Sequence, residues 1–465
     1  MKNYPMYSVD EVGTFLEFIL KIERKYSDNI AFKSINKQYT YGDFCNMVKS
    51  CVGALSSNKG KCFVIDTNNS LKFAVMYFAI VISGNIAVLM DEQDLKYVDI
   101  KEYEVISESD LDKILEYKSD YIEDSHNEDV CTIVCSSGTT SEKKGVMLSQ
   151  ANLLSDMRGG MLLYEYPENA IYVNILPYTH LFGVIADLLG PLFSGGTICI
   201  PNDKIHFFES LRYYRPTNLN LPPALVNAIY AMLISTGSFE MATGGRLKKV
   251  MCAGAKLNDD VNELFSQYGL RVYSAYGLTE CSPCVSMNRD HFYRQNSVGQ
   301  VLPCCSVDII DGEVTVVGKN VMLGYYKNKD ATNKVLRDGR LYTGDLGYVD
   351  DDGFLYLIGR KNSMIVFEDG KKILPEIVEN AICQLENIEE CLILPEENNC
   401  KIKLNIYIVS DENVNNEDLK NVLKDFNISN RIAEITIQRN KLKKNALGKI
   451  CLLYTSDAAD DRISV

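Results

Sequence analysis

The hydrophobic positions between residues 63 and 267 alternate between two patterns. Short runs rich in apolar residues, such as residues 63–66, 132–134 and 249–253, are typical of strands covered on both faces. Stretches with helical spacing lie between these runs. This alternation predicts an α/β fold with a mostly parallel, doubly wound sheet.

The pattern changes towards both ends of the chain. Residues 1–58 combine amphipathic helical spacing with a hairpin-like piece at residues 31–41, and Thr40 is placed to cap a helix that runs through Leu55. Residues 298–326 show short alternating strands separated by Gly-containing turns, which predicts a β subdomain.

After Arg360 the order of patterns is strand, a helix led by Pro375, strands and helix. We therefore predict a large N-terminal domain with doubly wound sheets and a β subdomain, followed by a small α+β domain. The expected domains are residues 1–360 and 361–450, with residues 451–465 as a separate tail.

The tail itself has a foreign character. Residues 451–461 read CLLYTSDAADD, which resembles the translation of a transposon-type sequencing adapter. An exposed polar tail is the alternative, but it gives no reason for this string. We expect residues 451–465 to be non-native sequence.

Residues 73–90 are a candidate membrane-spanning segment. Residues 73–90 carry no charge and are about as long as a minimal spanning helix. Ser83, Gly84 and Asn85 interrupt the stretch, however, and Asp91 ends it. We therefore predict a buried helix, a turn and a buried strand instead of a membrane span.

Composition narrows the classes of function. A chain of 465 residues is too long for one core, and 46% hydrophobic with 24% charged residues is typical of soluble globular proteins. The net charge of −14 without a basic stripe argues against a nucleic-acid partner. The 15 cysteines are scattered, Cys281 and Cys284 have no second pair at zinc spacing, and no secretory signal is visible, so we expect free thiols and a cytoplasmic protein.

The candidate chemistry begins at residues 131–150, CTIVCSSGTTSEKKGVMLSQ. A strand-like run feeds a loop of glycine and hydroxyl residues, a lysine pair follows, and Ser149 is placed to cap the next helix. Backbone N–H groups, hydroxyls and a lysine suit phosphate oxygens, although the Gly-x-x-x-x-Gly-Lys-Ser/Thr loop is absent. By itself this cluster is also compatible with a solvated turn.

Five further segments follow in a fixed order. They are LPYTHLFG at residues 176–183, YGLTE at 276–280, YTGDLGY at 342–348, GRKNSMIV at 359–366 and NALGKI at 445–450. Together with the loop they resemble the adenylate-forming superfamily, which includes acyl- and aryl-CoA ligases, peptide-synthetase adenylation domains and luciferases. In appearance the chain is most similar to the fatty-acyl-CoA ligases.

The resemblance implies a site for ATP. The residues that it places on the β- and γ-phosphates are Ser136, Ser137, Gly138, Thr139, Thr140 and Lys144. The residues that it places around the adenine are Gly254, Ala255, Tyr276 and Gly277.

The resemblance also implies residues that contact the α-phosphate, Mg²⁺, the ribose and the attacking carboxylate. Thr279 contacts the α-phosphate, Glu280 ligates Mg²⁺, and Asp345 binds the ribose hydroxyls with Arg360 reinforcing that contact. Lys449 reaches the α-phosphate and the attacking carboxylate. The alternatives are a solvated carboxylate for Glu280, a turn residue beside Gly344 for Asp345 and a surface lysine for Lys449.

Four positions depart from the family pattern. Ser141 and Lys143 stand where glycine and proline are usual, and Lys443 replaces a proline before Lys449. Asn362 stands at the hinge position, usually Asp or Lys, about which the small domain rotates between the half-reactions. Because asparagine accepts left-handed backbone conformations, we expect Asn362 to act as a hinge.

His180 and the segment after it bear on the substrate. A lone histidine at an apolar helix entry is often a packed core residue. Its place in LPYTHLFG implies a position at the acyl pocket or thiol tunnel, and residues 181–197 are mostly apolar. The Phe-Asp pair that amino-acid-activating relatives carry is missing, which favours a plain carboxylic acid.

We therefore expect an ATP- and Mg²⁺-dependent enzyme that activates a fatty or other apolar carboxylic acid as an acyl-adenylate and transfers it to CoA. One alternative is transfer to the thiol of a carrier protein that acts in trans. Another is a catalytically decayed protein that only binds a nucleotide or an acyl group.

Overall fold

The computed structural model describes residues 4–56, 59–66, 70–90, 92–115, 127–136, 143–201, 207–253, 259–294, 296–398 and 401–442. The chain divides into two compact units. The first unit comprises Met1–Asp308, Thr315–Tyr342 and Asp350–Leu355, and the second comprises Ile309–Val314, Thr343–Val349 and Tyr356–Val465. The predicted domain boundary at residue 360 remains a prediction.

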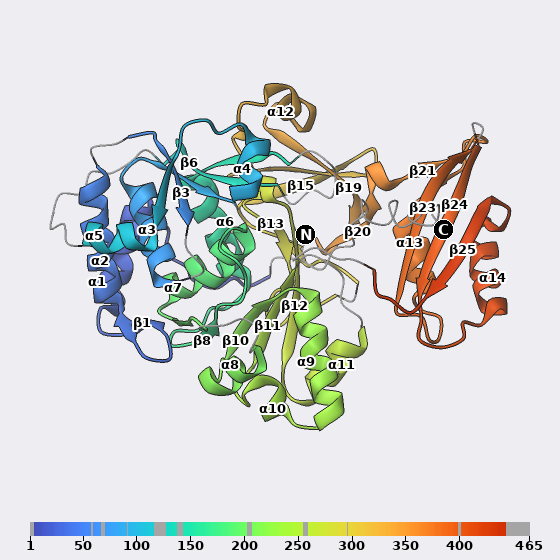
Figure 1. Ribbon diagram of the computed structural model, residues 1–465, viewed down its shortest axis with the longest axis horizontal. Coiled ribbons are helices and arrows are strands. Elements are labelled where there is room, and N and C mark those ends of the chain that lie inside the picture. The colour runs from blue at the N-terminus through green and yellow to red at the C-terminus, as the bar shows by residue number, and fades with distance from the viewer. Residues whose placement is uncertain are drawn as a thin grey trace, which may run out of the picture. The chain divides into compact units, whose positions relative to one another are not determined.

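A nine-stranded sheet forms much of the first unit, in the order β14-β13-β12-β11-β10-β8-β9-β1-β2 (Figure 1). Its strands are β1 (Ile30–Lys33), β2 (Gln38–Thr40), β8 (Ile171–Val173), β9 (Thr197–Cys199), β10 (Asn218–Leu221), β11 (Lys249–Ala253), β12 (Arg271–Gly277), β13 (Cys284–Met287) and β14 (Gln300–Val301). The pairs from β1 through β9, β8, β10 and β11 to β12 are parallel. The pairs at both ends are antiparallel.

A second sheet of the first unit has the order β17-β7-β6-β4-β3-β5. Its strands are β3 (Cys62–Asp66), β4 (Ile86–Leu89), β5 (Glu104–Ser107), β6 (Val130–Cys135), β7 (Gly145–Ser149) and β17 (Gly324–Tyr325). β3 pairs in parallel with β4 and β5, and β4 with β6, whereas β7 is antiparallel to its two neighbours. The predicted α/β class with doubly wound, mostly parallel sheets is confirmed.

Helices connect these strands. In the first unit they are α1 (Phe15–Tyr26), α2 (Tyr41–Leu55), α3 (Leu71–Ile82), α4 (Glu92–Val98), α5 (Glu108–Leu115), α6 (Gln150–Leu163), α7 (Gly190–Ser194), α8 (Phe207–Tyr214), α9 (Pro223–Thr236), α10 (Phe239–Thr243), α11 (Asp259–Gln267) and α12 (Lys329–Val335). α9 packs on β10 and β11, and α11 packs on β12 and α9, as Figure 1 shows.

Two of the predicted helix starts are confirmed in detail. The Thr40 and Ser149 side chains each accept a hydrogen bond from the backbone N–H three residues later, and Asp43 and Asn152 complete the two capping boxes. The stretch 73–90 is likewise a buried helix, a turn and a strand, namely α3 and β4 around residues 83–85. Within the described residues, no helix combines the length and the apolar character that crossing a membrane requires.

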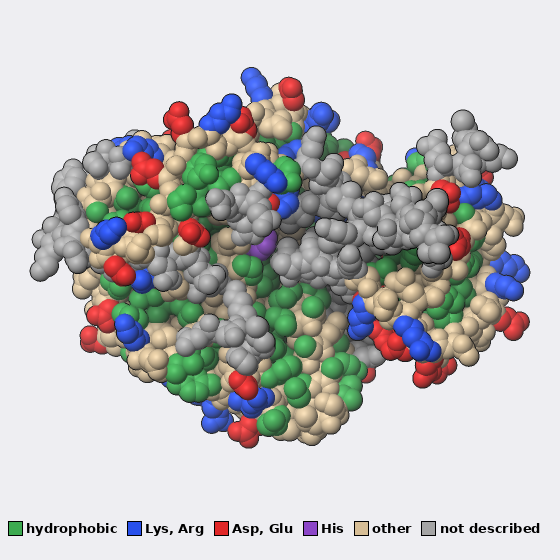
Figure 2. Space-filling model, viewed as in Figure 1, with side chains coloured by type: hydrophobic (Ala, Val, Ile, Leu, Met, Phe, Trp, Pro, Cys, Tyr) green, Lys and Arg blue, Asp and Glu red, His purple; other side chains and the backbone are tan. Residues whose placement is uncertain are grey.

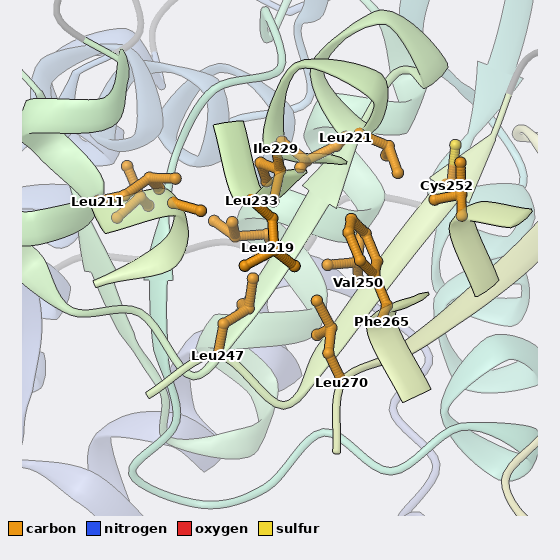
Figure 3. Packing of buried hydrophobic residues seen from close by; sticks show 14 of the residues in the cluster. Leu211, Leu219, Leu221, Ile229, Leu233, Leu247, Val250, Cys252, Phe265 and Leu270 are labelled. Atoms are coloured by element: carbon orange, nitrogen blue, oxygen red, sulfur yellow. The ribbon is translucent and has the colours of Figure 1, made fainter. Parts of the chain in front are cut away.

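The core beside β10, β11 and β12 explains why the sequences of these strands are rich in apolar residues. Leu219, Val250 and Phe265 pack between the sheet and the helices and are at most 1% exposed (Figure 3). Truncating one such side chain to alanine typically costs about 2–5 kcal/mol of stability. This packing fixes where β10, β11 and β12 end, and hence where the site residues that follow them lie.

One predicted helix differs in form. Residues 181–193 are helical, but the segment Gly183–Leu189 is a π-helix, η1, followed by α7. Inside this apolar run, Asp187 is 1% exposed. The apolar spacing predicted a buried helix, but it did not distinguish a π-helix from an α-helix.

The remaining strands form three smaller sheets. One has the order β15-β16-β19-β18 with β20 paired to β19; its strands are β15 (Cys305–Ile310), β16 (Glu313–Gly318), β18 (Leu336–Arg337), β19 (Arg340–Val349) and β20 (Leu355–Arg360). β21 (Ile365–Val366) pairs with β22 (Lys372–Ile373). β24 (Lys401–Val409) lies between β23 (Glu390–Asn398) and β25 (Ile432–Gln438).

The helices α13 (Pro375–Ile382) and α14 (Asn416–Asp425) complete the C-terminal part of the second unit. Its own core contains Val378, Ile393, Leu404, Ile406 and Leu419. Strands and helices here follow the predicted α+β order, with Pro375 in the first turn of α13.

On the face that Figure 2 shows, positive and negative side chains are interspersed.

Candidate functional site

The YGLTE segment lies at the carboxyl end of β12. Tyr276 and Gly277 are the last residues of this strand, and the short 3₁₀-helix η3 (Thr279–Cys281) begins two residues later. A Cβ atom at Gly277 would lie 1.8 Å from the carbonyl oxygen of Pro283, so only glycine fits there. Because β11 and β12 are parallel, this is the edge at which open α/β sheets bind ligands.

Backbone contacts hold Glu280 in place. The N–H of Met322 donates to the carbonyl of Glu280 at 2.9 Å, and the N–H of Leu278 donates to the carbonyl of Pro283 at 2.8 Å. The Ser282 hydroxyl donates to the Asn320 carbonyl at 2.8 Å. The turn after β12 is thus fastened to the segment that precedes β17.

A buried carboxyl on α6 supports the same turn. Oδ1 of Asp156 accepts hydrogen bonds from the backbone N–H of Cys284 at 3.0 Å and from Nδ2 of Asn320 at 3.4 Å. Asp156 is 1% exposed, and burial raises the pKa of its carboxyl well above the usual range. Asp156 therefore ties α6 to both segments that position Glu280.

The base of the predicted phosphate loop is a closed turn. The Ser136 N–H donates to the Lys144 carbonyl at 2.8 Å, and the Lys144 N–H donates to Oγ of Ser136 at 3.1 Å. These bonds extend the β6–β7 pairing and hold the two ends of the loop together. The predicted phosphate-binding residues Ser137, Gly138, Thr139 and Thr140 lie outside the described residues.

Tyr325 brings two of the motifs together. Its hydroxyl donates to Oε1 of Glu280 at 2.7 Å, and Nζ of Lys144 lies 5.5 Å from the centroid of its ring. Tyr325 is 8% exposed, and burial, followed by the charge of Glu280, raises the pKa of its phenol far above the usual value. The phenol is therefore a neutral hydrogen-bond donor between a predicted phosphate-binding cation and a predicted metal ligand.

None of the sequence motifs covers residues 319–326, so the sequence does not single out Tyr325. The pattern there predicts only part of a β subdomain. The signal that would have found Tyr325 is the pairing of β17 with β7, which places Tyr325 opposite Val146, directly after the loop. That pairing joins distant segments and leaves no local pattern in the sequence.

The donor set around Glu280 fits Mg²⁺. This ion is usually held by one or two carboxylates together with substrate phosphates and water, not by a cage of protein ligands. Glu280 offers one half-buried carboxylate, whose second oxygen accepts no hydrogen bond from a described residue. Among the described residues, no group of three or more His, Cys, Asp and Glu side chains is arranged to hold a metal by itself.

The predicted ribose-binding pair is formed in the second unit. Nε of Arg360 lies 2.8 Å from Oδ1 of Asp345, and the Arg360 guanidinium also donates from Nη1 to the Thr343 carbonyl at 3.3 Å. Nearby, Glu313 accepts from the Gly344 N–H at 2.9 Å and from Nζ of Lys361 at 2.7 Å. Asp345 and Arg360 thus adjoin, as expected, while their contact with ribose remains a prediction.

Asn362 lies in the middle of the short 3₁₀-helix η4 (Lys361–Ser363) and is exposed. Its φ is not in the left-handed region, which the prediction of a hinge had invoked. The backbone therefore needs no special residue at this position in the conformation observed, and the hinge role remains a prediction.

His180 lies at the entry to the buried π-helix. Its N–H donates to the Pro177 carbonyl at 3.1 Å, and its own carbonyl accepts from the Val184 N–H at 3.2 Å. The His180 side chain is half-buried. Its place at the acyl pocket remains a prediction.

A buried network fixes the chain on both sides of His180. Oδ2 of Asp187 accepts from the N–H groups of Ile175 at 3.2 Å and Leu176 at 3.1 Å, and Oδ1 accepts from Nδ2 of Asn220 at 2.7 Å. These contacts join the segment after β8, the π-helix and β10 at the carboxyl ends of the two parallel strands. Burial raises the pKa of Asp187 to about 6.

Three further predicted site residues lie outside the described part of the chain. They are Gly254, Ala255 and Lys449. The predicted tail, residues 451–465, also lies outside it.

The fold and these groups define a nucleotide-binding α/β enzyme, and comparison with known proteins identifies its family. Residues 90–326 match the family described as AMP-binding enzyme. The chain is 26% identical over 458 residues to 4-coumarate–CoA ligase-like 1 of Arabidopsis thaliana, which covers 84% of each protein. It is 30% identical over 282 residues to a long-chain-fatty-acid–CoA ligase of Salmonella typhimurium, which covers 57% of this chain and 49% of that one.

Solved structures agree in fold. ATP-bound MatB from Rhodopseudomonas palustris superposes with a TM-score of 0.82 at 20% identity, covering 96% of this chain and 99% of that one. The O-succinylbenzoate CoA synthetase of Bacillus subtilis, in complex with ATP and magnesium, gives 0.76 at 21% identity, covering 93% and 98%. The chain belongs to the AMP-binding enzymes, so the predicted membership of the adenylate-forming superfamily is confirmed.

Proposed function

We propose that the protein is an acid–thiol ligase. It joins a carboxylic acid to the α-phosphate of ATP with Mg²⁺ present, and then transfers the acyl group to the thiol of CoA. The acid is a fatty or other apolar acid. The observation that carries the proposal is the meeting of Lys144 and Glu280 at Tyr325, because it brings a cation for phosphate and a carboxylate for Mg²⁺ to one place.

The chemistry divides into two half-reactions. First, a carboxylate oxygen attacks the α-phosphorus of ATP, and the bond to the departing pyrophosphate breaks. Then the CoA sulfur attacks the acyl carbon, and AMP leaves. Both steps depend on positioning the reactants and on stabilising charge that develops on oxygen.

Each group then has a defined task. Lys144 and the Ser136 loop bind the β- and γ-phosphates, and Thr279 contacts the α-phosphate. Mg²⁺ held by Glu280 would neutralise phosphate charge as pyrophosphate leaves. Tyr276 and the Gly254–Ala255 turn enclose the adenine, Asp345 and Arg360 bind the ribose, and Lys449 serves the α-phosphate during adenylation.

The apolar character of the segment after His180 supports the proposed substrate class. Leu181, Val184, Ile185 and Leu188 are buried apolar side chains in this segment. The relatives named for 4-coumarate and for long-chain fatty acids support a carboxylic acid with CoA as acceptor.

The test is acid-dependent release of pyrophosphate from ATP by the purified protein, screened over fatty, aromatic and short dicarboxylic acids. We expect release with apolar acids. Glu280→Gln should need a higher Mg²⁺ concentration for the same rate. Glu263→Gln, an exposed glutamate on α11, is the matched control and should behave as the wild type. A protein that releases no pyrophosphate with any acid would be a decayed binding protein.

The acceptor is tested separately. Pyrophosphate-competent enzyme is given CoA or a purified carrier protein bearing its thiol, and thioester formation is followed directly. Thioester with CoA supports the proposal. If thioester forms with the carrier protein but not with CoA, the acyl acceptor is a carrier protein that acts in trans.

A further inference from the structure

The contacts of Tyr325 point to a residue with a task in the site that no motif assigns. Its phenol donates to Oε1 of Glu280 at 2.7 Å, and its ring face lies under Nζ of Lys144 at 5.5 Å. A cation within about 6 Å of a ring centroid is attracted to the face of the ring. One neutral side chain thus contacts two opposite charges.

Lys144 and Glu280, both within the described part of the chain, form no ion pair with each other. A direct ion pair between Lys144 and Glu280 would make each charge less available to a ligand, since a paired ammonium binds phosphate less well and a paired carboxylate binds a metal less well.

The backbone of Tyr325 is held on two sides. β17 pairs with β7, so that Tyr325 lies opposite Val146, and the Tyr326 N–H donates to the Gly145 carbonyl at 2.7 Å. The Tyr325 N–H donates to Oγ1 of Thr332 at 2.9 Å. The position of the phenol is therefore set by the strand that leaves the phosphate loop.

We propose that Tyr325 is a positioning residue: it orients the Glu280 carboxylate towards the metal and keeps Lys144 free for phosphate. This inference rests on the proposed function. No described residue donates a hydrogen bond to the second carboxylate oxygen of Glu280, and the ring gives Lys144 a neutral surface to lie on.

Three variants separate the two tasks. Tyr325→Phe keeps the ring under Lys144 but removes the donor to Glu280. Tyr325→Leu removes both. Tyr326→Phe is the matched control, because the neighbouring Tyr326 packs against the cluster that contains Val98 and Ile133.

The readout is equilibrium binding, which needs no turnover. Binding of α,β-methylene-ATP is measured by calorimetry with EDTA, and binding of Mn²⁺ to the nucleotide complex is measured by electron paramagnetic resonance. Melting temperatures are recorded for all variants.

For Tyr325→Phe we expect Mn²⁺ to bind about ten-fold more weakly, the effect of losing one hydrogen bond to a charged group, with metal-free nucleotide binding unchanged. For Tyr325→Leu both affinities should fall, and for Tyr326→Phe neither should.

Wild-type affinities in Tyr325→Phe would overturn the inference. So would equal losses of both affinities together with a lower melting temperature, which would mean that the tyrosine only supports the fold. A wild-type protein that binds no nucleotide would instead contradict the proposed function.

Discussion

Nε of Arg360 lies 2.8 Å from Oδ1 of Asp345, and the Asp345 side chain is 7% exposed whereas that of Arg360 is 48% exposed. The carboxylate is therefore fixed by a partner that solvent still reaches. Such a pair contributes little to stability, about 0–1 kcal/mol, because solvent screens it. Its value lies in holding the carboxylate in one orientation.

Arg360→Gln should therefore weaken ATP binding far more than it lowers the melting temperature. We expect the KM for ATP to rise about ten-fold, since a charge-assisted hydrogen bond that orients Asp345 is lost. The check is the KM for ATP against kcat for pyrophosphate release. Arg439→Gln, an exposed arginine of the same unit, is the control. An unchanged KM for ATP would argue against a role of Arg360 in binding the ribose.

The buried carboxyl of Asp187 predicts a dependence of stability on pH. Burial raises its pKa from the ordinary 3.8 to about 6. The folded protein then binds this proton more tightly than the unfolded chain does. The resulting stabilisation is fully present below about pH 4 and is lost as the pH rises through about 6, a change of about 3 kcal/mol.

Asp187→Asn removes this titration. The amide also turns an NH₂ group towards donors such as Nδ2 of Asn220, so the variant should be less stable at every pH. We expect the difference in unfolding free energy between wild type and variant to widen from pH 7 to pH 4. Urea unfolding at several pH values measures it. A gap that stays constant between pH 4 and 7 would show that Asp187 does not titrate in this range.

The sequence predicted those parts of the fold whose signals are local. Thr40 and Ser149 cap their helices because each is followed three residues later by a side chain that completes a capping box. The strand β11 was predicted with both of its ends, since its apolar run is bounded by charged and small residues.

The parts that were not predicted depend on contacts between distant segments. Tyr325 acquires its importance from the pairing of β17 with β7 and from the Met322 bond to Glu280. Asp187 is an acidic residue within a mostly apolar run, and the donors of Ile175, Leu176 and Asn220 explain why it is tolerated there. Neither arrangement leaves a periodic signal in the sequence.

Asn362 offers a test of the predicted hinge. It lies in the 3₁₀-helix η4, where φ suits proline, so Asn362→Pro should fit the observed conformation and restrict others. We expect a melting temperature near that of the wild type but unequal effects on adenylation and on thioester formation. Separate single-turnover assays of the two steps measure this. Equal losses in a folded variant would argue against a hinge at this residue.

Lys449 is the residue for which the family resemblance predicts the sharpest separation of the two half-reactions. An ammonium near the α-phosphate stabilises charge that develops as the carboxylate attacks, and removing one such donor typically lowers the rate ~10²–10³-fold. In the second half-reaction the negative charge develops on the acyl carbonyl oxygen instead. Lys449→Ala should therefore fail to make acyl-adenylate from ATP, yet convert supplied acyl-adenylate to thioester at a near-normal rate.

Lys441→Ala, which removes an exposed lysine paired with Glu389, is the matched control. If both half-reactions stay normal, Lys449 is a surface charge; if both are lost along with a lower melting temperature, it supports the fold. Only the split between the two single-turnover rates assigns Lys449 to adenylation.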